Sequence, residues 1–104
     1  MISAIPKTMK AAVLDAAGPP EAMQLRDVPV PHVTHDHVLI ALEYAGVGIW
    51  DAQQRSGKWG AVKPGTIPGV DGTGTIAAVG SDVTGLRVGD RVYSYSYGQP
   101  KGFY

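Results

Sequence analysis

The sequence of 104 residues contains no cysteine. This absence excludes disulfide bonds, thiolate zinc ligands and cysteine nucleophiles. The sequence also lacks an excess of charge of either sign, because nine basic residues balance nine acidic ones. A basic surface that would bind nucleic acid or an anionic membrane is therefore not expected.

Long apolar runs are lacking as well. The longest runs are far shorter than the roughly 20 residues that cross a bilayer, and the start "MISAIPKTMK" has no apolar core of signal-peptide length. We therefore expect a soluble, cytoplasmic protein with neither nucleic acid nor membrane as a partner. The length suits one domain with one core, which we place at residues 9–104 after an N-terminal extension over residues 1–8.

Glycine and proline, with 14 and 8 copies, interrupt the chain at short intervals. Between these breaks lie short β-prone runs at residues 10–16, 22–30, 37–47, 74–80 and 90–98. The first two runs are separated by Gly18-Pro19-Pro20 and predict a hairpin. The segment 49–57 allows only two helical turns and ends at Gly57, and residues 58–72 predict a long loop. The pattern predicts a mainly β fold, a small and partly open barrel or sandwich with one short helical connector.

The stretch "PGVDGTGTIAAVG" contains the pattern G-x-G-x-x-A, formed by Gly72, Gly74 and Ala77. In a dinucleotide-binding turn such glycines lead from a strand into a helix whose N-terminus faces the pyrophosphate. Here prolines and glycines come before the pattern, and β-branched residues with more glycines follow it, so no helix of about ten residues fits. We predict instead that these glycines lie at a bend and a close backbone approach in a β-strand.

Three segments carry a resemblance to a known family: "MKAAVLDAAGPPEAMQLRDVPVP", "HVLIALEYAGVGIWDAQQRSG" and "IPGVDGTGTIAAVGSDVTGLRVGDRVY". They resemble the N-terminal, GroES-like catalytic domain of the medium-chain dehydrogenase/reductase superfamily, which is alcohol dehydrogenase-like. The closest branch is that of the zinc-independent quinone oxidoreductases. The resemblance implies a GroES-like, partly open β-barrel over residues 9–104, cut before a separate nucleotide-binding domain.

The resemblance also bears on the metal. In zinc-dependent members a cysteine ligand would fall on Gly48, a histidine ligand on Val70 and the proton-relay hydroxyl on Trp50. Glycine and valine cannot bind zinc, which takes nitrogen, sulfur or carboxylate ligands. The resemblance therefore implies no zinc, and an oxidoreductase in which NADPH reduces a quinone or an α,β-unsaturated carbonyl by hydride transfer.

No certain catalytic residue follows from the resemblance, and the main nucleotide site lies outside the chain. By position, the resemblance implies a pocket for substrate and nicotinamide lined by Gly48, Trp50, Asp51, Gln53, Trp59 and Val70. Two of these residues have a structural alternative. Asp51 could pair with Arg55 one turn later, and Trp50 could be either core or an aromatic pocket wall.

Two other clusters allow more than one interpretation. The proline-bounded segment "PHVTHDH" favours a solvated loop over a metal site, although it holds His32, His35 and His37. Alternation on a strand places three tyrosines on one face, where they could line the cleft, form an interface or, as in most such stripes, pack; they are Tyr93, Tyr95 and Tyr97.

The chain ends at Phe103-Tyr104 as a new β-prone run begins. An unpaired strand edge there predicts a possible homodimer by strand pairing or exchange. We do not expect the chain alone to bind NADPH or to be active. Two other functions stay open for the same fold, a co-chaperonin-like ring subunit and a small β-barrel binding module.

Overall fold

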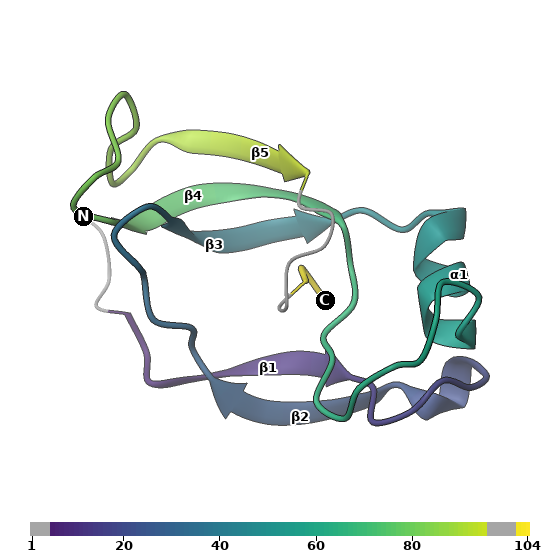
Figure 1. Ribbon diagram of the computed structural model, residues 1–104. Helices are drawn as coiled ribbons and strands as arrows, with labels where there is room; N and C mark the ends of the chain where they lie inside the picture. Colours follow the sequence, from purple (N-terminus) through teal and green to yellow (C-terminus); the bar gives the residue numbers. More distant parts are fainter. Residues whose placement is uncertain (1–4, 96–101) are drawn as a thin grey trace.

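The computed structural model describes residues 5–95 and 102–104 (Figure 1). The elements follow in the order β1 (Thr8–Val13), the 3₁₀ turn η1 (Pro20–Ala22), β2 (Gln24–Pro29), β3 (Val38–Ala45), α1 (Ile49–Ser56), β4 (Asp71–Val79) and β5 (Arg91–Tyr95). This order confirms the predicted mainly β fold with one short α-helix. In the described part of the chain, no helix has the length and apolar character needed to cross a bilayer.

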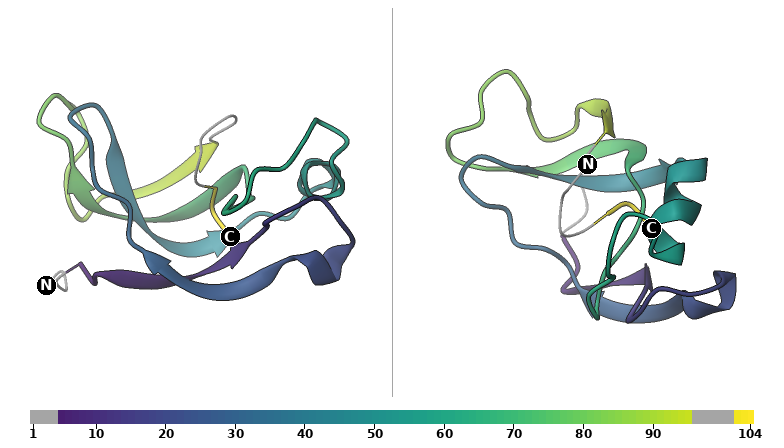
Figure 2. Two further views of the ribbon diagram at one scale, coloured as in Figure 1. Left: turned by 60° about the horizontal axis from the view of Figure 1, so that its bottom comes forward. Right: turned by 45° about the vertical axis from the view of Figure 1, so that its right-hand side comes forward.

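The strands form two antiparallel sheets. β1 pairs with β2, and the second sheet has the order β3-β4-β5. Figures 1 and 2 show the two sheets on opposite sides of the molecule, with α1 at one end. The sheets enclose an open barrel, as expected for a GroES-like domain.

The first hairpin is confirmed, with η1 in its turn, but β1 ends earlier than predicted. The strand pairs with β2 only as far as Val13. The main chain of Leu14 bonds to Thr66 instead, with N···O distances of 2.8 and 3.0 Å in the two directions. At its other end β1 includes Thr8, the last residue of the predicted N-terminal extension.

The glycine pattern lies inside a strand. β4 begins at Asp71, before the predicted start at residue 74, so it includes both Gly72 and Gly74. A Cβ atom at Gly74 would overlap the carbonyl of Ala41, and one at Gly72 would lie 3.0 Å from the Tyr44 carbonyl oxygen. The prediction of a close backbone approach in a strand is confirmed, and these glycines do not open a helix that could bind a pyrophosphate.

The core lies between the two sheets. Its buried apolar residues are Ala11, Val13, Leu14, Ile67, Val70 and Ile76. Residues 102–104, drawn in yellow, lie between the sheets (Figures 1 and 2). Gly102 N–H donates to the Ile67 carbonyl at 2.7 Å, and Tyr104 C=O accepts from Ala12 N–H at 3.1 Å. The final segment therefore pairs within its own chain, which removes the argument for a homodimer through a free edge at this place.

Candidate functional site

The turn between β3 and α1 is organised by Gly48 and Asp51. Gly48 precedes the first helical turn, and its N–H donates to Oδ2 of Asp51 at 2.8 Å. A carboxylate in this position is favourable, because the N-terminus of a helix carries partial positive charge. Asp51 is 5% exposed. The alternative pairing with Arg55 is wrong, since the guanidinium of Arg55 donates to the Gly18 carbonyl.

Trp50 packs its indole against Gly48. A Cβ atom at Gly48 would lie 2.6 Å from Cε2 of the indole, closer than side-chain atoms approach. Trp50 keeps 41% of its surface exposed, so it is not a core residue. The ring covers the start of α1 and occupies the space that any side chain at position 48 would need.

The other predicted pocket residues lie around α1 and the start of β4. Oε1 of Gln53 accepts the indole N–H of Trp59 at 3.1 Å, which joins α1 to the loop that follows it. Val70 is 5% exposed and belongs to the core. The structure thus brings Gly48 together with its two neighbours in the first helical turn, pairs Gln53 with Trp59, and leaves little of the Val70 side chain for a ligand.

A second group of side chains meets the same turn and was not predicted from the sequence. Asp71 lies directly against Gly46, where a Cβ atom would overlap its carboxylate. The hydroxyl of Tyr104 donates to the Gly46 carbonyl at 3.1 Å. Oδ1 of Asp51 and Oδ1 of Asp71 are buried and have no hydrogen-bond partner among the described residues. We call Gly46, Asp51, Asp71 and Tyr104 the acid–tyrosine cluster.

The charge of this cluster acts on its tyrosine. Burial raises the pKa of the Tyr104 hydroxyl above its ordinary value of 10.0, and the nearby Asp51 carboxylate and the negative charge of Asp71 raise it further. The hydroxyl is therefore a neutral hydrogen-bond donor throughout the physiological range. Sequence reasoning missed it because 58 positions separate Tyr104 from Gly46.

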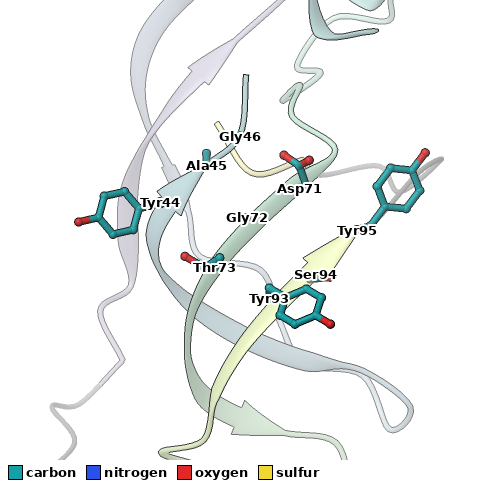
Figure 3. Close-up of a pocket in the computed structure, with 9 residues that line it drawn as sticks. All are labelled: Tyr44, Ala45, Gly46, Asp71, Gly72, Thr73, Tyr93, Ser94 and Tyr95. Carbon is teal, nitrogen blue, oxygen red and sulfur yellow. The ribbon is translucent and has the colours of Figure 1, made fainter. Parts of the chain in front are cut away.

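A hollow of about 480 Å³ opens beside Gly46 and Asp71, on the second sheet (Figure 3). Its lining consists of Tyr44, Ala45, Gly46, Asp71, Gly72, Thr73, Tyr93, Ser94 and Tyr95. Tyr93 is 88% and Tyr95 68% exposed, so neither packs into the barrel, and both line the hollow, which is another of the three alternatives for this stripe. Tyr97 lies outside the described residues. The six predicted pocket positions are not part of this lining.

The histidine segment is a solvated loop, as predicted. All three rings are exposed. Nδ1 of His35 lies 2.9 Å from Oδ2 of Asp82, and Nδ1 of His37 lies 2.7 Å from Oδ1 of Asp36. These two histidines therefore have separate acidic partners. Within residues 5–95 and 102–104, no three histidine, aspartate or glutamate side chains converge as a metal site requires.

Comparison with known proteins identifies the family of the chain. The model of the alcohol dehydrogenase GroES-like domain matches residues 34–102. The chain belongs to this family. Its GroES-like domain is 38% identical over 89 residues to an alcohol dehydrogenase of Schizosaccharomyces pombe, covering 85% of the chain and 25% of that protein. It is also 38% identical over 95 residues to the chloroplastic NADPH-dependent alkenal/one oxidoreductase of Arabidopsis thaliana, covering 88% of the chain and 25% of that protein.

Solved structures place the GroES-like domain among oxidoreductases as well. A mycobacterial quinone oxidoreductase is 36% identical and superposes with a TM-score of 0.78, over 85% of this chain and 28% of its own. A mycobacterial structure complexed with NADPH gives the same identity and coverage with a TM-score of 0.79. The domain thus spans about a quarter of the length of its relatives, and the predicted membership in the medium-chain dehydrogenases/reductases is confirmed.

Proposed function

We propose that the GroES-like domain is the catalytic-domain portion of a zinc-independent, NADPH-dependent oxidoreductase. Its substrate is a quinone or an α,β-unsaturated carbonyl, which it reduces by hydride transfer. One observation carries the proposal. The indole of Trp50 fills the space over Gly48, where the resemblance implies a zinc-binding side chain in zinc-dependent members.

The side chains present at the implied metal site do not fit a zinc ion. Gly48 has no side chain, and the buried side chain of Val70 is a hydrocarbon. Zinc needs nitrogen, sulfur or carboxylate ligands in a converging set. We derive no catalytic step through a metal, and we assign to this domain the binding and orientation of an apolar, electron-poor substrate.

The cofactor assignment rests on the relatives and on β4. The Arabidopsis protein is named as NADPH-dependent, and a structural neighbour holds NADPH. Gly72 and Gly74 are buried within β4 and do not form a phosphate-binding turn. We therefore place the main nucleotide site in a separate domain, and NADPH supplies the hydride when it is bound there.

The residues around α1 have the character of a substrate wall. Trp50 and Trp59 each keep 41% of their surface exposed, and Gln53 joins the second indole to the helix. Apolar surface with a few placed polar groups suits a flat, conjugated ligand. The oxidoreductase names of the relatives favour this function over the co-chaperonin and the binding module. The cytoplasmic location stays a prediction. The homodimer stays one as well, although the segment at residues 102–104 is paired within its own chain.

The complete reading frame that contains this chain tests the proposal. We expect it to encode a nucleotide-binding turn between a strand and a helix, and its product to oxidise NADPH in the presence of 1,4-naphthoquinone. The absorbance of reduced nicotinamide measures the reaction. Dialysis against a strong chelator is the matched control and should leave the rate unchanged. Chelator-sensitive oxidation of a primary alcohol with NAD⁺, without quinone reduction, would overturn the proposal.

The isolated 104-residue chain provides a second test. Since we place the main nucleotide site in another domain, titration of this chain with NADPH should give no saturable change in nicotinamide fluorescence. The product of the complete reading frame is the positive control. Saturation of the isolated chain at micromolar NADPH would show that its own residues bind the cofactor.

A further inference from the structure

Tyr104 is the point at which three separate segments of the chain are joined. Its N–H donates to the Pro68 carbonyl at 3.0 Å, and its C=O accepts from Ala12 N–H at 3.1 Å. Its hydroxyl reaches in the third direction and donates to the Gly46 carbonyl at 3.1 Å. One residue therefore connects the sheet of β1 and β2, the segment before β4 and the turn before α1.

The ring of Tyr104 is fixed before its hydroxyl makes this contact. It packs against the core cluster of Ala11, Val13 and Ile67. It also lies against Gly69, where a Cβ atom would be only 2.7 Å from Cδ1 of the ring. Because packing and main-chain bonds on both sides set the place of the ring, the hydroxyl has little freedom to move away from Gly46.

The turn that receives the hydroxyl leads directly into the proposed substrate wall. The N–H of Gly46 donates to the Asp71 carbonyl at 3.0 Å, and its carbonyl accepts from Tyr104, so both main-chain groups of this residue are held. Gly48 follows two residues later and begins α1 through its bond to Asp51. The position of Gly46 thus sets where Gly48, and the indole on it, can lie.

We propose that Tyr104 is a positioning residue whose hydroxyl holds the turn between β3 and α1, and thereby Gly48 and Trp50, in the geometry that accepts substrate. The inference rests on the proposed function only in assigning substrate binding to this turn. The contact itself joins two residues of the chain and does not depend on that function. The neutral state of the hydroxyl keeps the donor available at every physiological pH.

The first experiment uses the 104-residue chain and the variant Tyr104→Phe, which keeps the ring and removes the hydroxyl. Amide hydrogen exchange of Gly48 reports local opening of the turn, because this amide is bonded to Asp51. We expect exchange about fivefold faster, the factor that corresponds to one hydrogen bond of about 1 kcal/mol. The amide of Ile76, bonded to the Asp90 carbonyl at 2.9 Å, should keep its rate.

The matched control is Tyr93→Phe, which removes the hydroxyl of a tyrosine that is 88% exposed. It should change neither exchange rate. Equal acceleration at Gly48 and Ile76 in Tyr104→Phe would mean general destabilisation and would overturn the positioning role. An unchanged Gly48 rate would overturn it as well.

The second experiment uses the product of the complete reading frame with NADPH and 1,4-naphthoquinone. If the hydroxyl holds the substrate-accepting turn, Tyr104→Phe lowers the population of the competent turn and raises the KM for the quinone by up to about fivefold. The KM for NADPH and the kcat at saturating quinone should change little. A fall in kcat with unchanged KM would overturn the positioning role.

The two experiments separate the two proposals. If the product reduces no quinone, the proposed function fails, while the Gly48 exchange rate still decides whether Tyr104 holds the turn. If the turn opens in Tyr104→Phe and the KM for the quinone stays the same, the hydroxyl positions the turn but the turn does not set substrate binding, and the inference is overturned.

Discussion

Two polar clusters in this domain have opposite relations to the sequence. The histidine loop, residues 31–37, draws its charged and polar groups mostly from one short segment. Its side chains are exposed where they form hydrogen bonds, and His35 and His37 each have a close partner. The acid–tyrosine cluster gathers residues from positions 46, 51, 71 and 104, and two of its carboxylate oxygens are buried without a partner in the described chain. Polar residues that stand close together in the sequence therefore form a solvated loop. The cluster with buried carboxylate oxygens and a raised tyrosine pKa is formed by residues far apart in the sequence.

The difference has a physical cause. A short polar loop satisfies its groups locally or with water, so it is compatible with almost any surroundings. A buried carboxylate needs specific neighbours, because an unpaired charge is costly away from water. The second kind of cluster is therefore sensitive to changes in packing that the first kind tolerates, and the predictions below compare the two.

The largest effect is expected from Gly69→Ala. Gly69 has φ of 104°, and a Cβ atom there would meet the Tyr104 ring at 2.7 Å and the Phe103 nitrogen at 2.9 Å. We expect a loss of about 3 kcal/mol in the free energy of unfolding, from backbone strain and displacement of Tyr104 together. Chemical denaturation measures it.

Gly65→Ala is the matched control for this prediction. Gly65 has φ of 84°, and a Cβ atom there would have no neighbour within 4 Å. Gly65→Ala should lower the free energy of unfolding by only about 1 kcal/mol, from backbone strain alone. Equal losses in the two variants would show that contact with the final segment contributes nothing.

A smaller effect is expected from Asp51→Ala. The substitution removes the acceptor for Gly48 N–H at the start of α1. Loss of such a contact should lower the free energy of unfolding by about 1–2 kcal/mol. Asp82→Ala removes the exposed partner of His35 in the histidine loop. It should change the free energy of unfolding by less than about 0.5 kcal/mol. A reversed order of the two losses in urea denaturation would contradict the comparison.

The acid–tyrosine cluster should also show a pH dependence. The pKa of Tyr104 is higher in the folded chain than its ordinary value of 10.0, so above that pH the unfolded chain loses the proton first. Its contribution to stability is full below about pH 10 and is lost as the pH rises, by at most about 1.4 kcal/mol per pH unit. Tyr104→Phe should show a shallower decline between pH 10 and 11 in denaturation experiments. An identical decline would exclude Tyr104 as its source.

The smallest effect is expected in the histidine loop. Hydrogen bonds from His37 and Thr34 hold the pKa of Asp36 below its ordinary value of 3.8. The contribution to stability is therefore present above that value and lost as the pH falls through the lowered pKa. Asp36→Asn should lower the Tm slightly near neutral pH and only at low salt, because the group is exposed. A loss of Tm that persists in concentrated salt would contradict this.

Local signals in the sequence predicted much of the fold. Gly57 ends α1 with φ of 85°, as a glycine after a short helical run should, and alternation located β3. The start of β4 was misplaced because Asp71 and Gly72 stand among prolines and glycines typical of a loop. Their strand partners lie far away in the sequence: Gly72 pairs with Ala45 of β3, and Asp71 and Gly72 lie opposite Tyr95 and Ser94 of β5. No local pattern contains these partners.

The candidate site was predictable only where a motif repeats a known arrangement. The positions of Gly48 and Trp50 followed from the resemblance, but the contact between them did not. Asp51 was placed at the start of α1, yet its partner is the Gly48 N–H and not the expected Arg55. Tyr104 gave no signal, because its role arises from three segments that meet only after folding.

The indole over Gly48 has a consequence for the redesign of this domain. A cysteine at position 48 would collide with Trp50 in its present rotamer, so the two positions cannot change in either order with equal ease. A thiol at position 48 is sterically acceptable only after the indole, which is 41% exposed, has turned away or has been replaced. Engineering that begins at position 48 therefore requires a movement of the indole, and engineering that begins at position 50 does not.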